Sequence, residues 1–73
     1  MAGTRRLPHE ALSNREIEVM KQIVSGVPLL KISIAFNLST NTVTTYRRRI
    51  LDKLNLASNT SLARYAMENK LFP

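Results

Sequence analysis

The 73 residues of this chain make one small domain, close to the lower size limit for a protein that folds around its own hydrophobic core. The sequence has no cysteine, which excludes disulfides and thiolate metal sites, so packing must stabilise the fold. Eleven Lys and Arg against five Asp and Glu leave a net charge of +6, which favours a polyanionic partner such as DNA, RNA or an anionic membrane. No apolar run approaches the ~20 residues of a membrane span and no signal-peptide pattern opens the chain, so we expect a cytoplasmic protein without membrane contact.

The chain begins with a segment that lacks helical periodicity. Residues 1–11 contain Gly, Pro and adjacent arginines, and we interpret them as a flexible linker or N-terminal arm preceding a domain over residues 12–73. The first helix is predicted after Ser13, because Ser13 and Glu16 have the spacing of a capping box. Gly26 is expected to end this helix. Its buried arc is predicted to contain Val19, Met20, Ile23 and Val24.

A second, shorter helix is predicted to begin at Pro28, which is tolerated at a first helical position. Its buried face is expected to hold Leu29, Ile32, Ala35 and Phe36. Asn37 predicts a tight turn after it, since Asn adopts left-handed backbone angles more readily than most residues. Leu30 and Ile34 fall on the outer face, either as ordinary exposed apolar residues or as a contact for a partner such as a regulatory domain or a polymerase subunit.

The third predicted helix, about residues 40–54, is the most informative. At about 100° per residue, Val43, Ile50 and Leu54 share one narrow apolar arc. The outward residues are Asn41, Thr44, Thr45, Arg48, Arg49 and Asp52. An outer face of Thr, Asn and Arg is equipped to contact nucleic acid, whereas the alternative for three consecutive arginines is a solvated cationic face.

Two residues, one in the third helix and one in the first, leave alternatives open. Tyr46 lies at the edge of the apolar arc, where its hydroxyl either reaches a phosphate or simply borders the core. Glu16 of the first helix is either a capping carboxylate or the partner of a cation such as Arg47.

A fourth helix is predicted over residues 59–69, after a break at residues 55–58, with Leu62 and Ala66 buried. Its outward side chains are Thr60, Arg64, Met67 and Glu68, which suit a two-fold contact between two copies; Arg64 and Glu68 can alternatively pair within one helix. No strand pattern competes. The sequence therefore predicts an all-α fold, a compact four-helix bundle in which the second and third helices form a helix-turn-helix.

Several anchors agree in order and spacing with one family. Over residues 10–72 the chain resembles the LuxR/FixJ-type helix-turn-helix domain, the C-terminal DNA-binding module of NarL-like bacterial response regulators, quorum-sensing receptors and some free-standing regulators. The anchors are Leu12-Ser-Asn-Arg-Glu16, Val19-Met20, Gly26, Ile32, Leu38-Ser39, Thr42-Val43, Lys53-Leu54 and Ala66.

The resemblance implies sequence-specific binding of double-stranded DNA in bacterial transcription regulation, with the third helix in the major groove and a dimer formed through the fourth helix. By this resemblance, the base-reading positions fall on Thr44, Thr45 and Arg48. The phosphate-contacting positions fall on Asn41, Thr42, Tyr46, Arg47, Arg49 and Lys53. The chain departs from the family in the second helix, where the frequent pattern Asn-Lys-Glu-Ile-Ala is replaced by Leu29-Leu-Lys-Ile-Ser33.

Other functions fit less well. One histidine, no cysteine and five scattered carboxylates give no catalytic or metal constellation, so we expect neither an enzyme nor a cofactor. RNA binding is disfavoured because the few aromatic residues are scattered. A protein–protein interaction module is the alternative from another class; it predicts little salt dependence, whereas neutralising about six phosphates gives a log–log slope near −5. The linker-like start favours an output domain of a two-component response regulator over a free-standing small LuxR-type regulator.

Overall fold

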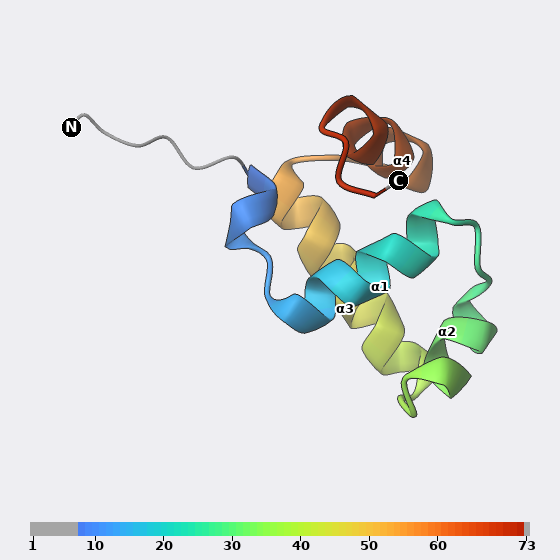
Figure 1. Cartoon of the computed structure of the whole chain (residues 1–73). Helices are drawn as coiled ribbons and strands as arrows, with labels where there is room; N and C mark the ends of the chain where they lie inside the picture. Colours follow the sequence, from blue (N-terminus) through green and yellow to red (C-terminus); the bar gives the residue numbers. More distant parts are fainter. Residues whose placement is uncertain (1–7, 73) are drawn as a thin grey trace.

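The fold is built from helices throughout the part of the chain that the structure describes. The computed structural model describes residues 8–72, which form a 3-10 turn, η1 (Pro8–Ala11), and the helices α1 (Asn14–Val24), α2 (Leu29–Ala35), α3 (Thr40–Leu54) and α4 (Asn59–Glu68) (Figure 1). Residues 8–72 contain no strand, so the predicted all-α class and the four-helix order are confirmed.

Three of the helices have a serine as the N-cap residue, and its hydroxyl accepts a hydrogen bond from the first turn. The Ser13 hydroxyl accepts a hydrogen bond from the Glu16 backbone N–H at 3.2 Å, and the Glu16 carboxylate accepts one from the Ser13 N–H at 2.8 Å, so the predicted capping box is confirmed. Ser39 and Ser58 cap α3 and α4 in the same way, each at 3.1 Å. Each cap joins residues only three positions apart, so the sequence is sufficient to predict where these helices begin.

The turns use residues that tolerate left-handed backbone angles. Asn37 has φ 55° between α2 and α3, as predicted, and Asn55 has φ 56° at the end of α3. The Leu38 N–H then donates to the Ser33 carbonyl at 2.8 Å, which closes the short turn of the helix-turn-helix.

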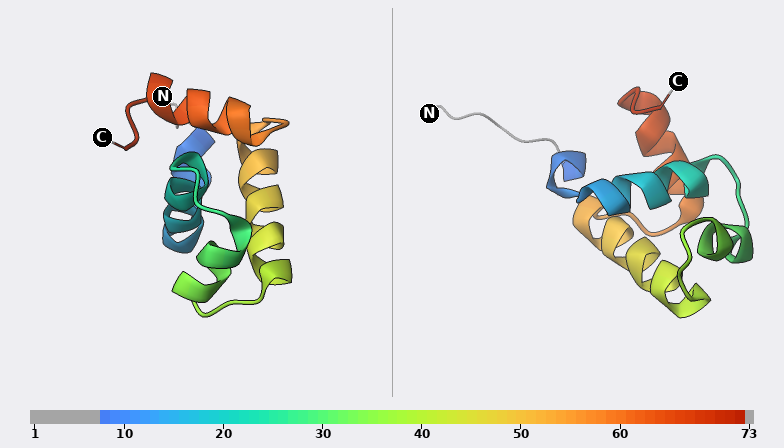
Figure 2. Two further views of the ribbon diagram at one scale, coloured as in Figure 1. Left: turned by 90° about the vertical axis from the view of Figure 1, so that its right-hand side faces the viewer. Right: turned by 60° about the horizontal axis from the view of Figure 1, so that its bottom comes forward.

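The core lies where α1 and α2 meet α3 and where α4 meets α1. Helix α1 packs against α3 and α4, and α2 packs against α3. The two further views place α4 across one end of the pair formed by α1 and α3, with α2 at the other end (Figure 2). The buried hydrophobic residues are Leu12, Val19, Met20, Ile32, Val43, Ile50, Leu51, Leu54, Leu62 and Ala66.

Two expectations for α2 were wrong. Pro28 is the extended N-cap residue (ψ 151°) and α2 begins one residue later. Leu29 is 41% exposed and Ala35 is also exposed, whereas Ser33 is buried and its hydroxyl donates to the Leu30 carbonyl at 2.6 Å. At about 100° per residue, Ala35 lies about 110° from the centre of the buried arc between Ile32 and Ser33, whereas Leu29 lies within about 10° of that centre and is exposed at the first position of the helix. A helix this short packs through only one stripe.

The segment expected to be a linker ends in a packed turn. In η1, the His9 backbone N–H donates to the Tyr65 hydroxyl oxygen at 3.3 Å, and His9 Nδ1 lies 2.9 Å from the same oxygen. Residues 8–11 thus form a turn that contacts α4, while the domain boundary expected at Leu12 stays a prediction. Residues 1–7 lie outside the described residues.

Candidate nucleic-acid interface

One side of α3 faces solvent along its whole length. Val43 and Ile50 are completely buried and fix the helix from behind. The exposed residues on the opposite side are Asn41, Thr44, Thr45, Arg48, Arg49 and Asp52. The three residues assigned to base contact, Thr44, Thr45 and Arg48, are thus exposed together on a single face, while their contact with DNA stays a prediction.

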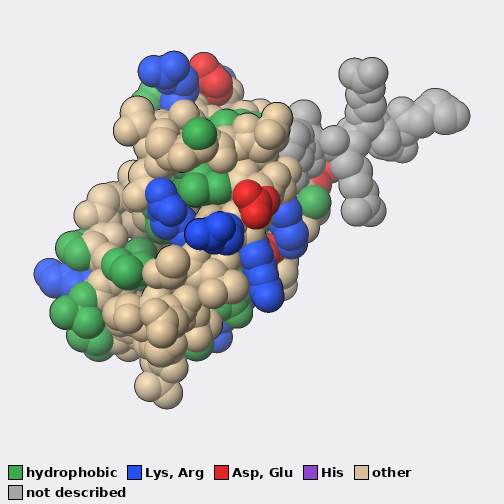
Figure 3. Space-filling model, turned by 180° about the vertical axis from the view of Figure 1, so that it is seen from behind, with side chains coloured by type: hydrophobic (Ala, Val, Ile, Leu, Met, Phe, Trp, Pro, Cys, Tyr) green, Lys and Arg blue, Asp and Glu red, His purple; other side chains and the backbone are tan. Residues whose placement is uncertain are grey.

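Helix α3 lies on the side of the molecule turned away from the viewer of Figure 1. Seen from behind, Lys and Arg side chains gather near the middle of this side, with hydrophobic side chains grouped at one end (Figure 3). The α3 sequence supplies Arg47, Arg48, Arg49 and Lys53 against a single acid, Asp52. This side therefore combines positive charge with hydroxyl groups, which suits a phosphate backbone beside base edges.

Two hydroxyls of the α3 N-terminal half are already used inside the helix. The Thr45 hydroxyl donates to the Asn41 carbonyl at 3.0 Å, which fixes the rotamer of a β-branched side chain. Thr42 Oγ1 lies 2.9 Å from the Ser39 hydroxyl oxygen. The Thr45 hydroxyl is therefore available to a partner as a hydrogen-bond acceptor and not as a free donor.

The four cations of α3 fall into two groups. Arg48 and Arg49 are exposed, and neither takes part in an ion pair within the described residues. Arg47 is half-buried, and its Nε–H donates to Asn59 Oδ1 of α4 at 2.7 Å. Lys53 also contacts another helix. The sequence did not indicate the Arg47–Asn59 contact, because the two residues lie 12 positions apart and no local pattern marks Asn59.

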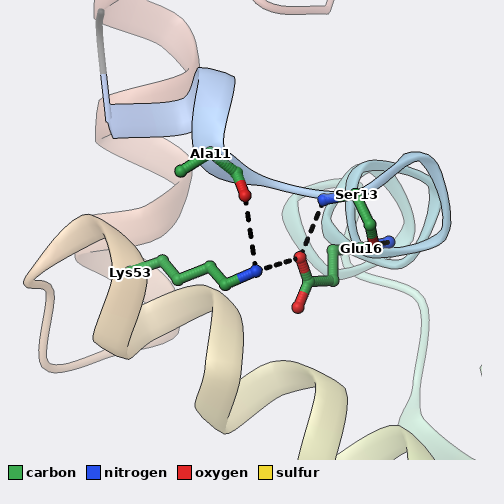
Figure 4. Close-up of polar contacts among 4 residues, drawn as sticks. All are labelled: Ala11, Ser13, Glu16 and Lys53. Atoms are coloured by element: carbon green, nitrogen blue, oxygen red, sulfur yellow. Dashed lines mark hydrogen bonds and ion pairs between the residues drawn. The ribbon is translucent and has the colours of Figure 1, made fainter.

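Lys53 joins α3 to the start of α1 (Figure 4). Its ammonium group lies 2.8 Å from Glu16 Oε1 and donates to the Ala11 carbonyl at 3.3 Å. Glu16 is therefore both the predicted capping carboxylate and half of an ion pair, with Lys53 in place of the Arg47 considered from the sequence. Arg47 lies on the other flank of α3, toward α4, about 120° from Lys53 on the helical wheel.

The same contacts control the titration of Glu16. Burial raises the pKa of its carboxyl, but hydrogen bonds from Lys53 and the Ser13 backbone, with the Lys53 charge, outweigh burial and lower that pKa below its ordinary value. The folded protein thus binds this proton less tightly than the unfolded chain does. The stabilisation is complete above the ordinary pKa of about 4.3 and is lost as the pH falls through the lowered value.

Glu16→Gln is expected to lower the free energy of unfolding by about 1 kcal/mol at pH 7, because the amide keeps the capping acceptor but loses the ion pair. The expected effect is modest because the Lys53 side chain is 39% exposed and solvent screens the pair. Urea unfolding at several pH values measures this difference, which should shrink below about pH 4. Glu18→Gln is the control, since Glu18 forms only an exposed pair with Arg15 at 3.8 Å. A difference that stays constant down to pH 3 would contradict the assignment.

Two other predicted surfaces are exposed. On α2, Leu30 is 62% and Ile34 is 70% exposed. On α4 the exposed residues are Thr60, Arg64, Met67 and Glu68, and Arg64 and Glu68 form no ion pair with each other. These positions are accessible to a partner, and no contact with one is part of this structure.

Grouped metal ligands and helices able to cross a membrane are both absent from the described residues. No three His, Asp or Glu side chains among residues 8–72 are grouped as metal ligands. No helix in the same range has the length and apolar character needed to cross a membrane.

Comparison with known proteins identifies relatives of the whole described unit. Residues 10–66 match the family described as bacterial regulatory proteins, luxR family. The chain is 38% identical over 64 residues to the response regulator UvrY of Escherichia coli (strain K12), covering 88% of the chain and 29% of UvrY. It is 36% identical over 70 residues to the transcriptional regulatory protein LiaR of Bacillus subtilis (strain 168), and the match covers 96% of the chain and 33% of LiaR. It is 40% identical over 62 residues to the response regulator GacA of Pseudomonas viridiflava, and the match covers 85% of the chain and 29% of GacA. The chain thus spans about a third or less of the length of these relatives.

Proposed function

Because the chain belongs to the luxR family of bacterial regulatory proteins, we propose that it binds specific sequences in double-stranded DNA by inserting α3 into the major groove. Its relatives are named response regulators and a transcriptional regulatory protein, so it is a domain for DNA-binding transcription regulation and not an enzyme. The observation that supports the α3 placement is its exposed face of Thr, Asn and Arg, held from behind by the completely buried Val43 and Ile50.

Arg48 has the most to offer a base edge. Its planar guanidinium group, free of ion pairs in the described part of the chain, has the geometry to donate to O6 and N7 of one guanine. Thr44 and Thr45 offer hydroxyl oxygens and methyl groups, which suit the donor groups of bases and the thymine methyl. Base specificity is therefore assigned to these three residues.

Phosphate contacts position α3 in the groove. Asn41, Thr42, Tyr46 and Arg49 surround the outward face and supply hydroxyl, amide and guanidinium donors. Arg47 and Lys53 complete the proposed set, each with fewer free donors, since their Nε and Nζ groups already bond to Asn59, Glu16 and Ala11.

The active form is proposed to be a homodimer on paired half-sites. The exposed α4 residues Thr60, Arg64, Met67 and Glu68 offer one apolar side chain and both charges, which suits a two-fold contact in which Arg64 of each copy meets Glu68 of the other. We place this activity in the cytoplasm, as the output domain of a two-component response regulator; a free-standing regulator is the alternative.

Selection of binding sequences from random duplex DNA, followed by titration of the selected duplex at several salt concentrations, tests this function. We expect an enriched motif of paired half-sites and a log–log salt slope near −5 for about six neutralised phosphates. A single unpaired half-site would contradict the dimer. Failure to enrich any sequence, with binding that ignores salt, would favour a protein–protein interaction module.

The outer face of α2 is proposed as a contact for RNA polymerase or a receiver domain. Two neutral substitutions, Leu30→Gln and Ile34→Gln, leave the net charge unchanged and should preserve both stability and binding to the selected duplex, because both side chains are largely exposed. Transcription in vitro from a promoter carrying the selected site should fall several-fold if the contact is with polymerase. Unchanged transcription would rule out a polymerase contact at this face.

A further inference from the structure

Helix α4 has few direct connections to α3. It packs mainly against α1, its Leu62 is completely buried, and α3–α4 is not among the main packing pairs of the described residues. The hydrogen bond from Arg47 Nε to Asn59 Oδ1, at 2.7 Å, joins the middle of α3 directly to the first residue of α4. This bond therefore connects the helix that carries the proposed DNA contacts to the helix that carries the proposed dimer contacts.

The two partners of this bond have different surroundings. Arg47 lies beside the apolar arc of α3, on the flank away from Thr45 and Asp52, and the residue is half-buried, although its bond to Asn59 is exposed to solvent. Asn59 directly follows Ser58, whose hydroxyl accepts from the Ser61 N–H and orders the first turn of α4. A half-buried side chain of α3 thus meets the exposed first residue of α4, directly after the Ser58 cap.

We propose that Arg47 and Asn59 are a positioning pair that sets the angle between α3 and α4, and thereby the spacing between the two half-sites that a dimer recognises. This inference rests on the proposed function as a dimer on DNA. Arg47 acts here by orienting α4 and not by reading a base.

Helix α4 is long enough for a small change in its angle to alter the spacing between the two half-sites. Helix α4 has 10 residues, which gives a length of about 15 Å at 1.5 Å per residue. A swing of about 10° around its Asn59 end moves the far end, near Met67 and Glu68, by about 3 Å. That displacement is close to the rise of about 3.4 Å per base pair in DNA. Loss of the Arg47–Asn59 bond should therefore let the dimer accept spacers that differ by one base pair.

The test measures binding of the 73-residue chain to duplexes that carry two half-sites with the selected spacer, to duplexes with one base pair fewer or more, and to a single half-site. Asn59→Ala removes the acceptor, and Arg47→Lys keeps the charge while removing the planar fork. Asn14→Ala is the matched control, because Asn14 is likewise the exposed first residue of a helix that follows a serine cap. Thermal unfolding of each variant verifies folding.

For Asn59→Ala, the preference for the selected spacer over its neighbours should fall about threefold to tenfold, with single half-site affinity within about twofold of the parent chain. Arg47→Lys should relax the spacer preference equally, and the double variant should add nothing further. Asn14→Ala should retain the parent profile.

Three results would overturn the positioning role. In the first, Asn59→Ala keeps the spacer profile of the parent chain. In the second, it weakens every duplex by the same factor, which would make Asn59 a DNA contact. In the third, the parent chain binds a half-site but ignores spacing. Failure of the parent chain to bind any duplex is a different result, since it would overturn the proposed function itself.

Discussion

Arg48→Ala is expected to weaken binding about 5- to 150-fold for each half-site of the selected duplex, corresponding to 1–3 kcal/mol for one bidentate contact to guanine. Affinity for unrelated DNA should fall much less, because a lost base contact removes discrimination while only one positive charge leaves the surface. Titration of both duplexes at one fixed salt concentration measures the ratio of specific to nonspecific affinity. Repeating the selection with the variant should show relaxed preference at one position of each half-site.

The matched control for Arg48 is its neighbour. Arg49→Ala removes the same charge from an exposed position on the same helix, but Arg49 is proposed to contact phosphate. It should weaken specific and nonspecific binding alike and make the salt slope shallower by about 1 for each bound half-site. Equal effects of the two substitutions on specificity would remove Arg48 from the base-reading set.

Ile50→Ala should produce the largest loss of stability. Ile50 is completely buried where α3 meets the core, and truncation of such a residue costs about 2–5 kcal/mol through lost transfer free energy and the cavity left behind. A domain of this size has a free energy of unfolding of only about 4–11 kcal/mol. Its melting temperature should therefore drop by about 10 °C or more, as measured by circular dichroism.

Ile34→Ala provides the control for this loss. The substitution removes the same atoms from a helix, but Ile34 is 70% exposed, so its removal creates no cavity. The melting temperature should change by no more than about 2–4 °C, since surface substitutions usually stay within about 0.5 kcal/mol. A similar loss for both variants would mean that α3 is not anchored through Ile50.

The proposed site was only partly predictable. The outward placement of Thr44, Thr45 and Arg48 follows from the helical period of Val43 and Ile50, and the structure agrees with it. The separation of the α3 cations into two groups does not follow from that period. Arg47 and Lys53 are assigned to phosphates by resemblance, yet each has a protein partner, Asn59 and Glu16 respectively.

The amino-acid sequence by itself determined where the helices begin and where the chain turns between them, because both depend on contacts between neighbouring residues. The Ser13–Glu16 capping box and the left-handed Asn37 involve residues within one turn of each other, so short-range hydrogen bonds and backbone sterics are sufficient to specify them. The tertiary structure alone decided which stripe of α2 is buried and which helix each flank of α3 contacts. Those choices depend on how whole helices pack, and packing joins side chains such as Glu16 and Lys53 that lie 37 residues apart and carry no local sign of each other.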